Sequence, residues 1–174
     1  MLVYFSMDVL ISEDAIRQRV RELAAQIRRD HPTDLHFVCV LKGALVFLAD
    51  LARAVPGDAT FDFMAVSSYG ASTTSSGQVQ ILKDLEMGIE GREVVIVEDI
   101  VDSGLTLNYL QQVLLTRSPR SLQTVCLLSK PSRRKVNVPV DYIGFTIEDR
   151  FVVGYGLDYA GRYRNLPYIA VIGD

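Results

Sequence analysis

Apolar and polar residues alternate along this chain in blocks that predict strands and helices in turn. Short runs rich in β-branched residues predict strands over 35–41, 61–67, 94–97, 124–128, 140–147 and 168–172. Helical spacing predicts helices from the candidate N-cap Ser12 to about residue 31, over about 44–55 and over about 106–115. Strands that alternate with helices predict an α/β fold with a mainly parallel twisted sheet flanked by helices.

The composition is that of a globular protein. Of the 174 residues, 49% are hydrophobic and 22% are charged, which suits a single domain, 1–174, with a full core. The apolar runs are too short to cross a bilayer, and the first residues lack the basic region of a signal peptide, so we expect a cytoplasmic protein with no membrane partner. Cys39 and Cys126 lie in apolar runs without metal-ligand spacing, which predicts buried free thiols.

The charge distribution argues against a nucleic-acid partner. The chain carries 18 basic and 21 acidic residues, a net charge of −3, without a sustained basic stripe. Its one basic cluster, 133–135, follows Pro131 and is predicted to be a solvated turn. His31 and His36 show no ligand spacing, and we expect no chemistry from them.

The most informative segment is 94–106, VVIVEDIVDSGLT. Its continuous β-branched run predicts a strand buried on both faces of a parallel sheet. The acids that follow, Glu98, Asp99 and Asp102, are therefore expected at the carboxyl end of the strand, which is the edge where open α/β sheets bind ligands. Taken alone, an acidic pair in a loop also fits a mere cap of the next turn.

The residues after these acids predict a phosphate cradle. Gly104 permits a left-handed backbone, while Ser103 and Thr106 offer hydroxyls just before a helix N-terminus. Carboxylates repel a bare polyphosphate, but they accept hydrogen bonds from ring hydroxyls or hold a divalent cation. A ribose 5-phosphate therefore fits the segment. A Walker A loop does not, and the chain has no GxGxxG motif.

This acidic turn resembles the phosphoribosyl pyrophosphate signature of type I phosphoribosyltransferases. The segments LKGALVFLADL, SSYG…ILKDL, LLSKPSRR and FVVGYGLDYAGRYRNLPYI resemble the 6-oxopurine branch, the bacterial hypoxanthine-guanine phosphoribosyltransferases, in one order from Leu35 to Ile172. The resemblance implies the family fold with a small hood region and a mobile flap at about 67–84. It also implies purine salvage: phosphoribosyl transfer to N9 of hypoxanthine or guanine, which yields IMP or GMP and pyrophosphate.

The resemblance assigns roles to the residues of the turn. Glu98 and Asp99 approach the ribose hydroxyls directly or through Mg²⁺, and Asp102 exchanges a proton with purine N7. We expect Asp102 to be buried beside the other two carboxylates. The 5′-phosphate contacts come from Ser103, Gly104, Leu105 and Thr106. Leu105 stands where some members carry a polar or basic residue, so only its backbone N–H is carried over.

Two further segments match the family at the pyrophosphate. Lys42 and Gly43 present backbone N–H groups there, beside a cis peptide predicted between Leu41 and Lys42, although the same residues also fit ordinary helix entry. Asp158 would ligate a second Mg²⁺ and Arg164 would bind pyrophosphate. Without the resemblance, Asp158 is a turn carboxylate.

The purine site is implied in the same way. Lys130 contacts the 6-oxo oxygen, Phe151 stacks on the ring and the Val152 backbone meets its Watson-Crick edge. Without the resemblance, Lys130 would face solvent at a strand end and the other two would be core residues. Ser68 and Tyr69 match the catalytic flap. On composition alone, the Ser/Thr/Gly-rich segment 67–80 is predicted to be mobile, either as a lid over bound substrate or as an insertion without a role.

Two other functions compete with this interpretation. One is a regulator that keeps the same fold, senses nucleotides and contacts RNA or DNA. The other is a phosphoacceptor receiver domain, which also combines strand-end acids with a lysine but does not need Ser-Gly-x-Thr. The resemblance further implies a homodimer or homotetramer, while the preference among hypoxanthine, guanine and xanthine stays open.

Overall fold

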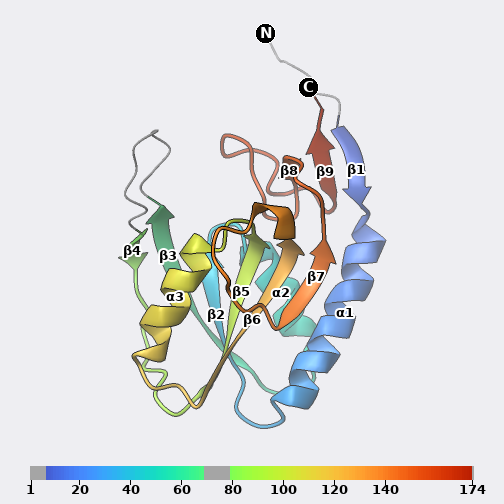
Figure 1. Cartoon of the computed structure of the whole chain (residues 1–174). Helices are drawn as coiled ribbons and strands as arrows, with labels where there is room; N and C mark the ends of the chain where they lie inside the picture. The colour runs from blue at the N-terminus through green and yellow to red at the C-terminus, as the bar shows by residue number, and fades with distance from the viewer. Residues whose placement is uncertain (1–6, 69–78, 174) are drawn as a thin grey trace.

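A central sheet carries five of the six predicted strands and one strand that was not predicted, Val79–Lys83, whereas the predicted strand 168–172 belongs to a smaller sheet. In this computed structural model, which describes residues 7–68 and 79–173, the strands are β2 (His36–Leu41), β3 (Thr60–Ser68), β4 (Val79–Lys83), β5 (Glu93–Val101), β6 (Ser121–Ser129) and β7 (Tyr142–Thr146). Their order is β4-β3-β2-β5-β6-β7 (Figure 1). Every pair is parallel except β3 with β4. The predicted mainly parallel α/β sheet is confirmed.

Helices cover the two faces of this sheet (Figure 1). The core on one face joins the sheet to α1 (Glu13–Asp30) and α2 (Leu45–Ala54), and the core on the other face joins it to α3 (Leu105–Leu115). Ser12 caps α1 as predicted, since its Oγ accepts a hydrogen bond from the Ala15 N–H at 3.2 Å. Of the helices described, none is long and apolar enough to span a membrane.

A second, smaller sheet matches the predicted hood. It contains β1 (Met7–Ile11), β8 (Val152–Val153) and β9 (Ile169–Ile172) in the antiparallel order β1-β9-β8. Figure 1 places it beyond the carboxyl ends of the central strands. β1 was not predicted, because four of its five residues are exposed and it pairs with a segment from the other end of the chain.

Both ends of the segment 67–80, which was predicted to be mobile, belong to strands. Ser67 and Ser68 end β3, and Val79 and Gln80 begin β4, with Ser68 opposite Val79 in the antiparallel pair. Pairing across the two strands gives these polar residues backbone partners that their composition does not reveal. Tyr69 lies outside the described residues, so the mobile flap stays a prediction.

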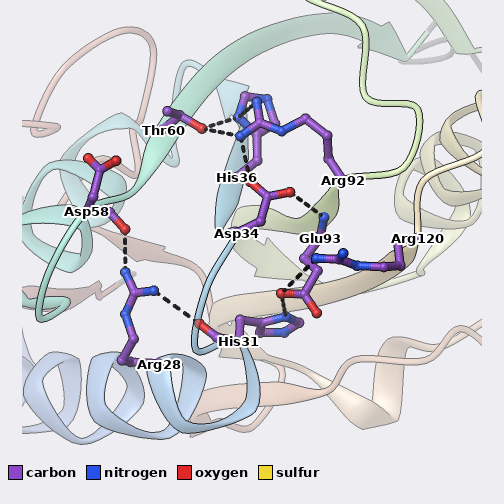
Figure 2. A network of polar contacts seen from close by, with 9 residues as sticks. All are labelled: Arg28, His31, Asp34, His36, Asp58, Thr60, Arg92, Glu93 and Arg120. Carbon is purple, nitrogen blue, oxygen red and sulfur yellow. Dashed lines mark hydrogen bonds and ion pairs between the residues drawn. The ribbon is translucent and has the colours of Figure 1, made fainter.

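The amino ends of the central strands are joined by a polar network (Figure 2). The His36 side chain is fully buried, and its Nδ1 lies 2.8 Å from the Thr60 hydroxyl. Arg92 donates to Asp34 at 2.8 Å in the same network. Buried His31 lies nearby, at the end of α1. Both histidines are at the end of the sheet opposite the acidic turn.

The two central strands separate before they end. β2 pairs with β5 from His36 opposite Val94 to Cys39 opposite Val97, and no further. Yet β2 stays paired with β3 to Leu41, and β5 stays paired with β6 to Val101. The chain leaves β2 for β3 on one side and β5 for β6 on the other, so this separation is the switch point where such sheets bind ligands.

Candidate active site

The acidic turn lines a pocket of about 190 Å³ at this switch point. Glu98 and Asp99 lie within the last half of β5 rather than after it, which corrects the prediction. The strand continues because β6 pairs with it as far as Val101. The other expected residues that line the pocket are Asp102, Ser103, Gly104 and Thr106.

Burial dominates the electrostatics of the acidic pair. It raises the pKa of Glu98 well above its usual range, and the Asp99 charge adds to this effect. Burial also raises the pKa of Asp99 to about 6, although the Ile100 N–H, 2.7 Å from Oδ1, and the charge of Arg164 oppose the shift. Two adjacent carboxylates, of which Glu98 is buried and Asp99 half-buried, favour a cation or hydrogen-bond donors from a ligand.

Asp102 differs from its two neighbours. Its side chain is exposed, so the expected burial is wrong. The reason is its place in the chain, since β5 ends at Val101 and Asp102 begins the turn that leaves the sheet. Its Oδ1 accepts a hydrogen bond from the Ser103 N–H at 2.6 Å. A carboxylate that lines the pocket and remains exposed is accessible to a ligand entering from solvent.

The turn predicted to be a phosphate cradle has the expected backbone. α3 begins at Leu105, and its N-cap Gly104 has a φ of +81°, which is left-handed. A Cβ atom at position 104 would lie 2.7 Å from Cγ1 of Val138, so both backbone and space require glycine. The N–H groups of the first helical turn and the helix dipole there favour a phosphate.

The Lys42-Gly43 loop packs directly against the acidic pair. The predicted cis peptide between Leu41 and Lys42 is present. A Cβ atom at Gly43 would lie 1.7 Å from Oδ2 of Asp99, and one at Gly156 would lie 2.1 Å from the Gly43 carbonyl oxygen. The loop is therefore held between β5 and the segment that follows β8.

Arg164 and Asp158 lie next to that segment. Nη1 of Arg164 donates to the Gly156 carbonyl at 2.6 Å, and Nη2 lies 3.1 Å from Oδ1 of Asp158. Asp158 is thus paired with an arginine rather than with the acids of β5. Among the described residues, no group of three His, Cys, Asp or Glu side chains is arranged to hold a metal ion.

The three residues implied for purine binding differ in burial: Lys130 and Val152 are buried, and Phe151 is exposed. Lys130 is buried, with its Nζ 3.6 Å from Oδ1 of Asp149, so it does not face solvent as a strand-end lysine usually does. Val152 is buried in β8, whereas Phe151 is 55% exposed and packs edge-on against Tyr159 at 5.7 Å. An exposed ring offers a face for stacking, so the core interpretation fails for Phe151 and holds for Val152.

Sequence reasoning missed two residues beside this site. Arg134, predicted to be part of a solvated turn, donates hydrogen bonds to the backbone at the ends of β5 and β6. Asp149 forms ion pairs with Lys130 and Arg133. Arg133 and Lys135 are exposed as predicted. The Arg-Arg-Lys pattern carries no signal for which of its three side chains turns inward.

A larger cavity of about 570 Å³ lies elsewhere, between α1, α2 and residues 164–167. Of the expected site residues, only Arg164 lines it. The pocket at the switch point and this cavity are therefore different features, and the residues predicted to form a phosphate cradle line the former.

The comparison with known families agrees with this geometry. A family model described as the phosphoribosyl transferase domain matches residues 9–160. The chain belongs to this phosphoribosyltransferase family. The predicted family and fold are thereby confirmed, and the receiver-domain alternative is wrong.

Relatives of this phosphoribosyltransferase match it over nearly its whole length. It is 52% identical over 165 residues to hypoxanthine-guanine phosphoribosyltransferase of Bacillus subtilis, covering 94% of this chain and 92% of that protein. It is 49% identical over 170 residues to hypoxanthine phosphoribosyltransferase of Escherichia coli, covering 96% of each. A crystal structure of a hypoxanthine-guanine phosphoribosyltransferase from Bacillus anthracis superposes with a TM-score of 0.92 at 47% identity, covering 98% and 100% of the two chains.

Proposed function

We propose that this phosphoribosyltransferase transfers the 5-phosphoribosyl group from phosphoribosyl pyrophosphate to N9 of hypoxanthine or guanine, forming IMP or GMP and pyrophosphate in purine salvage. The observation that carries the proposal is the acidic pair of buried Glu98 and half-buried Asp99 at the switch point, beside the N-terminus of α3. This combination suits a sugar phosphate, because the carboxylates accept from hydroxyls while the helix end binds the phosphate. The names of the close relatives support the 6-oxopurine substrates.

The donor would be held by the β5 to α3 turn. Glu98 and Asp99 accept hydrogen bonds from the ribose 2′- and 3′-hydroxyls or hold Mg²⁺ beside them, and Ser103 to Thr106 bind the 5′-phosphate. Mg²⁺ typically uses one or two carboxylates together with substrate phosphate oxygens, which fits a site where the described residues offer no cluster of three protein ligands. When bound, Mg²⁺ supplies positive charge that stabilises the leaving pyrophosphate.

The pyrophosphate would be bound on the other side of Asp99. The backbone N–H groups of Lys42 and Gly43 and the guanidinium of Arg164 stabilise negative charge as the bond to the anomeric carbon breaks. Asp158 would hold a second Mg²⁺ together with pyrophosphate oxygens and would exchange its present Arg164 partner for that ion. The Asp158 carboxylate lies 3.1 Å from the Arg164 guanidinium, so both groups would be close to the same bound pyrophosphate.

The purine would bind in contact with the side chains of Asp102, Lys130 and Phe151. Asp102 exchanges a proton with N7, which changes the nucleophilicity of N9. Lys130 donates to the 6-oxo oxygen and so favours oxopurines over aminopurines, while Phe151 stacks on the ring and the Val152 backbone contacts its edge. Ser68 and Tyr69 would close over the donor and exclude water from the ribosyl cation.

We expect a cytoplasmic enzyme that assembles as a homodimer or homotetramer, without a nucleic-acid or membrane partner. Light scattering on the purified protein measures the assembly directly. The rival function, a nucleotide-sensing regulator that contacts RNA or DNA, predicts a gel shift with nucleic acid. The retained Asp102, Lys130 and Phe151 are the features that favour the enzyme.

Parallel kinetics with four bases test the proposal. Hypoxanthine, guanine, xanthine and adenine are compared at saturating phosphoribosyl pyrophosphate and Mg²⁺, by the absorbance change on nucleotide formation. We expect turnover with hypoxanthine or guanine and none above background with adenine. Adenine turnover at a comparable rate, or no turnover with any base together with a gel shift, would contradict the proposal.

A further inference from the structure

Arg134 joins the ends of two neighbouring strands. It follows the short 3₁₀ helix 131–133 after β6, and its guanidinium points back to the sheet. Nη1 donates to the carbonyl oxygens of Val101 at 2.6 Å, Asp102 at 2.7 Å and Lys130 at 3.3 Å. Nη2 donates to the Ser129 hydroxyl at 2.9 Å. One side chain therefore spans the last residues of β5 and β6.

Backbone contacts reinforce this junction. The Lys130 N–H donates to the Val101 carbonyl at 2.9 Å, and the Lys135 N–H donates to the Ser103 carbonyl at 2.9 Å. Arg134 also packs close to Gly104, where a Cβ atom would lie 3.6 Å from its Cδ. The segment 130–135 thus runs alongside the turn that carries Asp102.

The two residues joined by Arg134 have different tasks in the proposed function. Asp102 exchanges the proton at purine N7, and Lys130 contacts the 6-oxo oxygen, so both must meet one planar base at once. Arg134 donates to the backbone carbonyls of these two residues and not to their side chains. It therefore acts on the base only through the backbone that it holds.

The chemistry of the side chain fits this task. A guanidinium offers several N–H donors in a fixed plane, so it can hold carbonyls of two strands in one geometry. Hydrogen bonds from a charged donor are stronger than those between neutral groups. A lysine at this position would keep the charge but lose the planar fork.

We propose that Arg134 is a positioning residue that fixes the Asp102 carboxylate relative to the Lys130 ammonium for binding of the purine. This inference rests on the proposed function. It predicts a defect in the steps that involve the base, with binding of phosphoribosyl pyrophosphate left intact.

The test compares Arg134→Met and Arg134→Lys with Lys135→Met, which removes the same charge from the adjacent exposed position. For each variant we measure kcat, the KM of both substrates and the ratio of kcat/KM for hypoxanthine and adenine. Displacements near 1 Å cost about 100-fold in rate, so we expect Arg134→Met to lose roughly 10- to 100-fold in kcat/KM for hypoxanthine. The KM for phosphoribosyl pyrophosphate should stay within about twofold, because the hydrogen bonds of Arg134 go to none of the proposed donor contacts.

Arg134→Lys distinguishes geometry from charge. We expect Arg134→Lys to show much of the loss in kcat/KM for hypoxanthine that Arg134→Met shows, and a smaller preference for hypoxanthine over adenine than the wild type. Lys135→Met should behave as wild type. If Arg134→Met does not fold, the same measurements on Arg134→Lys decide the question. Wild-type kinetics in Arg134→Lys, an equal loss in Lys135→Met, or a raised KM for the donor with unchanged kcat would overturn the inference. An inactive wild-type protein would instead contradict the proposed function.

Discussion

Gly43 lies directly against the carboxylate of Asp99. A Cβ atom at position 43 would lie 1.7 Å from Oδ2 and 2.7 Å from Cγ of Asp99, well inside any tolerated contact. The contact joins the loop after β2 to the end of β5, where these strands have already separated. The proposed pyrophosphate site and the proposed ribose site therefore share one fixed boundary.

Gly43→Ala is expected to displace Asp99 and to impair both sites. A displacement of about 1 Å in a reacting group costs about 100-fold in rate, and we expect a loss of kcat of that order. Gly88→Ala is the matched control, because a Cβ atom at position 88 would have no neighbouring atom within 4 Å. Steady-state kinetics check the pair, and equal activity in the two variants would contradict the role of this contact.

Asp102→Asn tests the proton transfer. The change keeps the shape of the side chain and the acceptor for the Ser103 N–H, but it removes the titratable group. We expect turnover to fall by roughly two to four decades, the range for loss of a general acid or base. Because Asp102 is exposed, the unfolding temperature should hardly change. Undiminished turnover in a folded variant would remove Asp102 from the mechanism.

The raised pKa of Asp99 predicts how stability depends on pH. Its folded-state pKa of about 6 lies above the ordinary value of 3.8, so the folded state binds the proton more tightly than the unfolded state. This stabilisation is present below about pH 4 and is lost as the pH rises through about 6, with a total of about 3 kcal/mol. Burial of Glu98 acts in the same direction.

Urea unfolding at pH 5 and pH 7.5 measures this effect. Asp99→Asn removes the titration, so we expect a smaller loss of stability between the two pH values than in the wild type. Mg²⁺ at pH 7.5 should stabilise the wild type more than the variant, because the ion favours the charged carboxylate. An identical pH dependence in the two proteins would show that Asp99 does not carry the effect.

The two cysteines are expected to be unreactive in the folded protein. Burial raises the pKa of the Cys39 thiol and of the Cys126 thiol to about 12, so hardly any reactive thiolate exists at pH 8. A colorimetric thiol reagent should find no fast-reacting group in native protein and two per chain after denaturation in guanidinium chloride. Rapid labelling of the native protein would contradict the burial of these strands.

Much of the central sheet follows from local sequence. The fully buried strand residues 94–97 form a continuous β-branched run, and the end of this run marks the turn that follows. The cap Ser12 and the helical spacing after it mark α1. The hood could not be derived in this way, because β1 is mostly exposed and acquires its partner from β9. Strand pairing between distant segments leaves little trace in either sequence alone.

The site shows the same division. The acids, the glycine turn and the Lys42-Gly43 loop were expected near one another, and Gly43 indeed contacts Asp99. The exposure of Asp102 depends on how far β6 extends the pairing of β5, which no local pattern encodes. The inward direction of Arg134 depends likewise on carbonyl oxygens more than thirty positions away in the chain.

Calorimetric titration of phosphoribosyl pyrophosphate tests the central claim, that the acidic pair at the switch point holds the ribose of the donor. The titration is made with Mg²⁺ into the wild type and into Asp99→Asn, whose side chain retains an acceptor for the Ile100 N–H. We expect saturable binding of one donor per chain in the wild type. In the variant we expect affinity to be lower by roughly tenfold or more, since hydrogen bonds to a charged group are lost. No heat from the wild type, or equal affinity in the two proteins, would contradict the account.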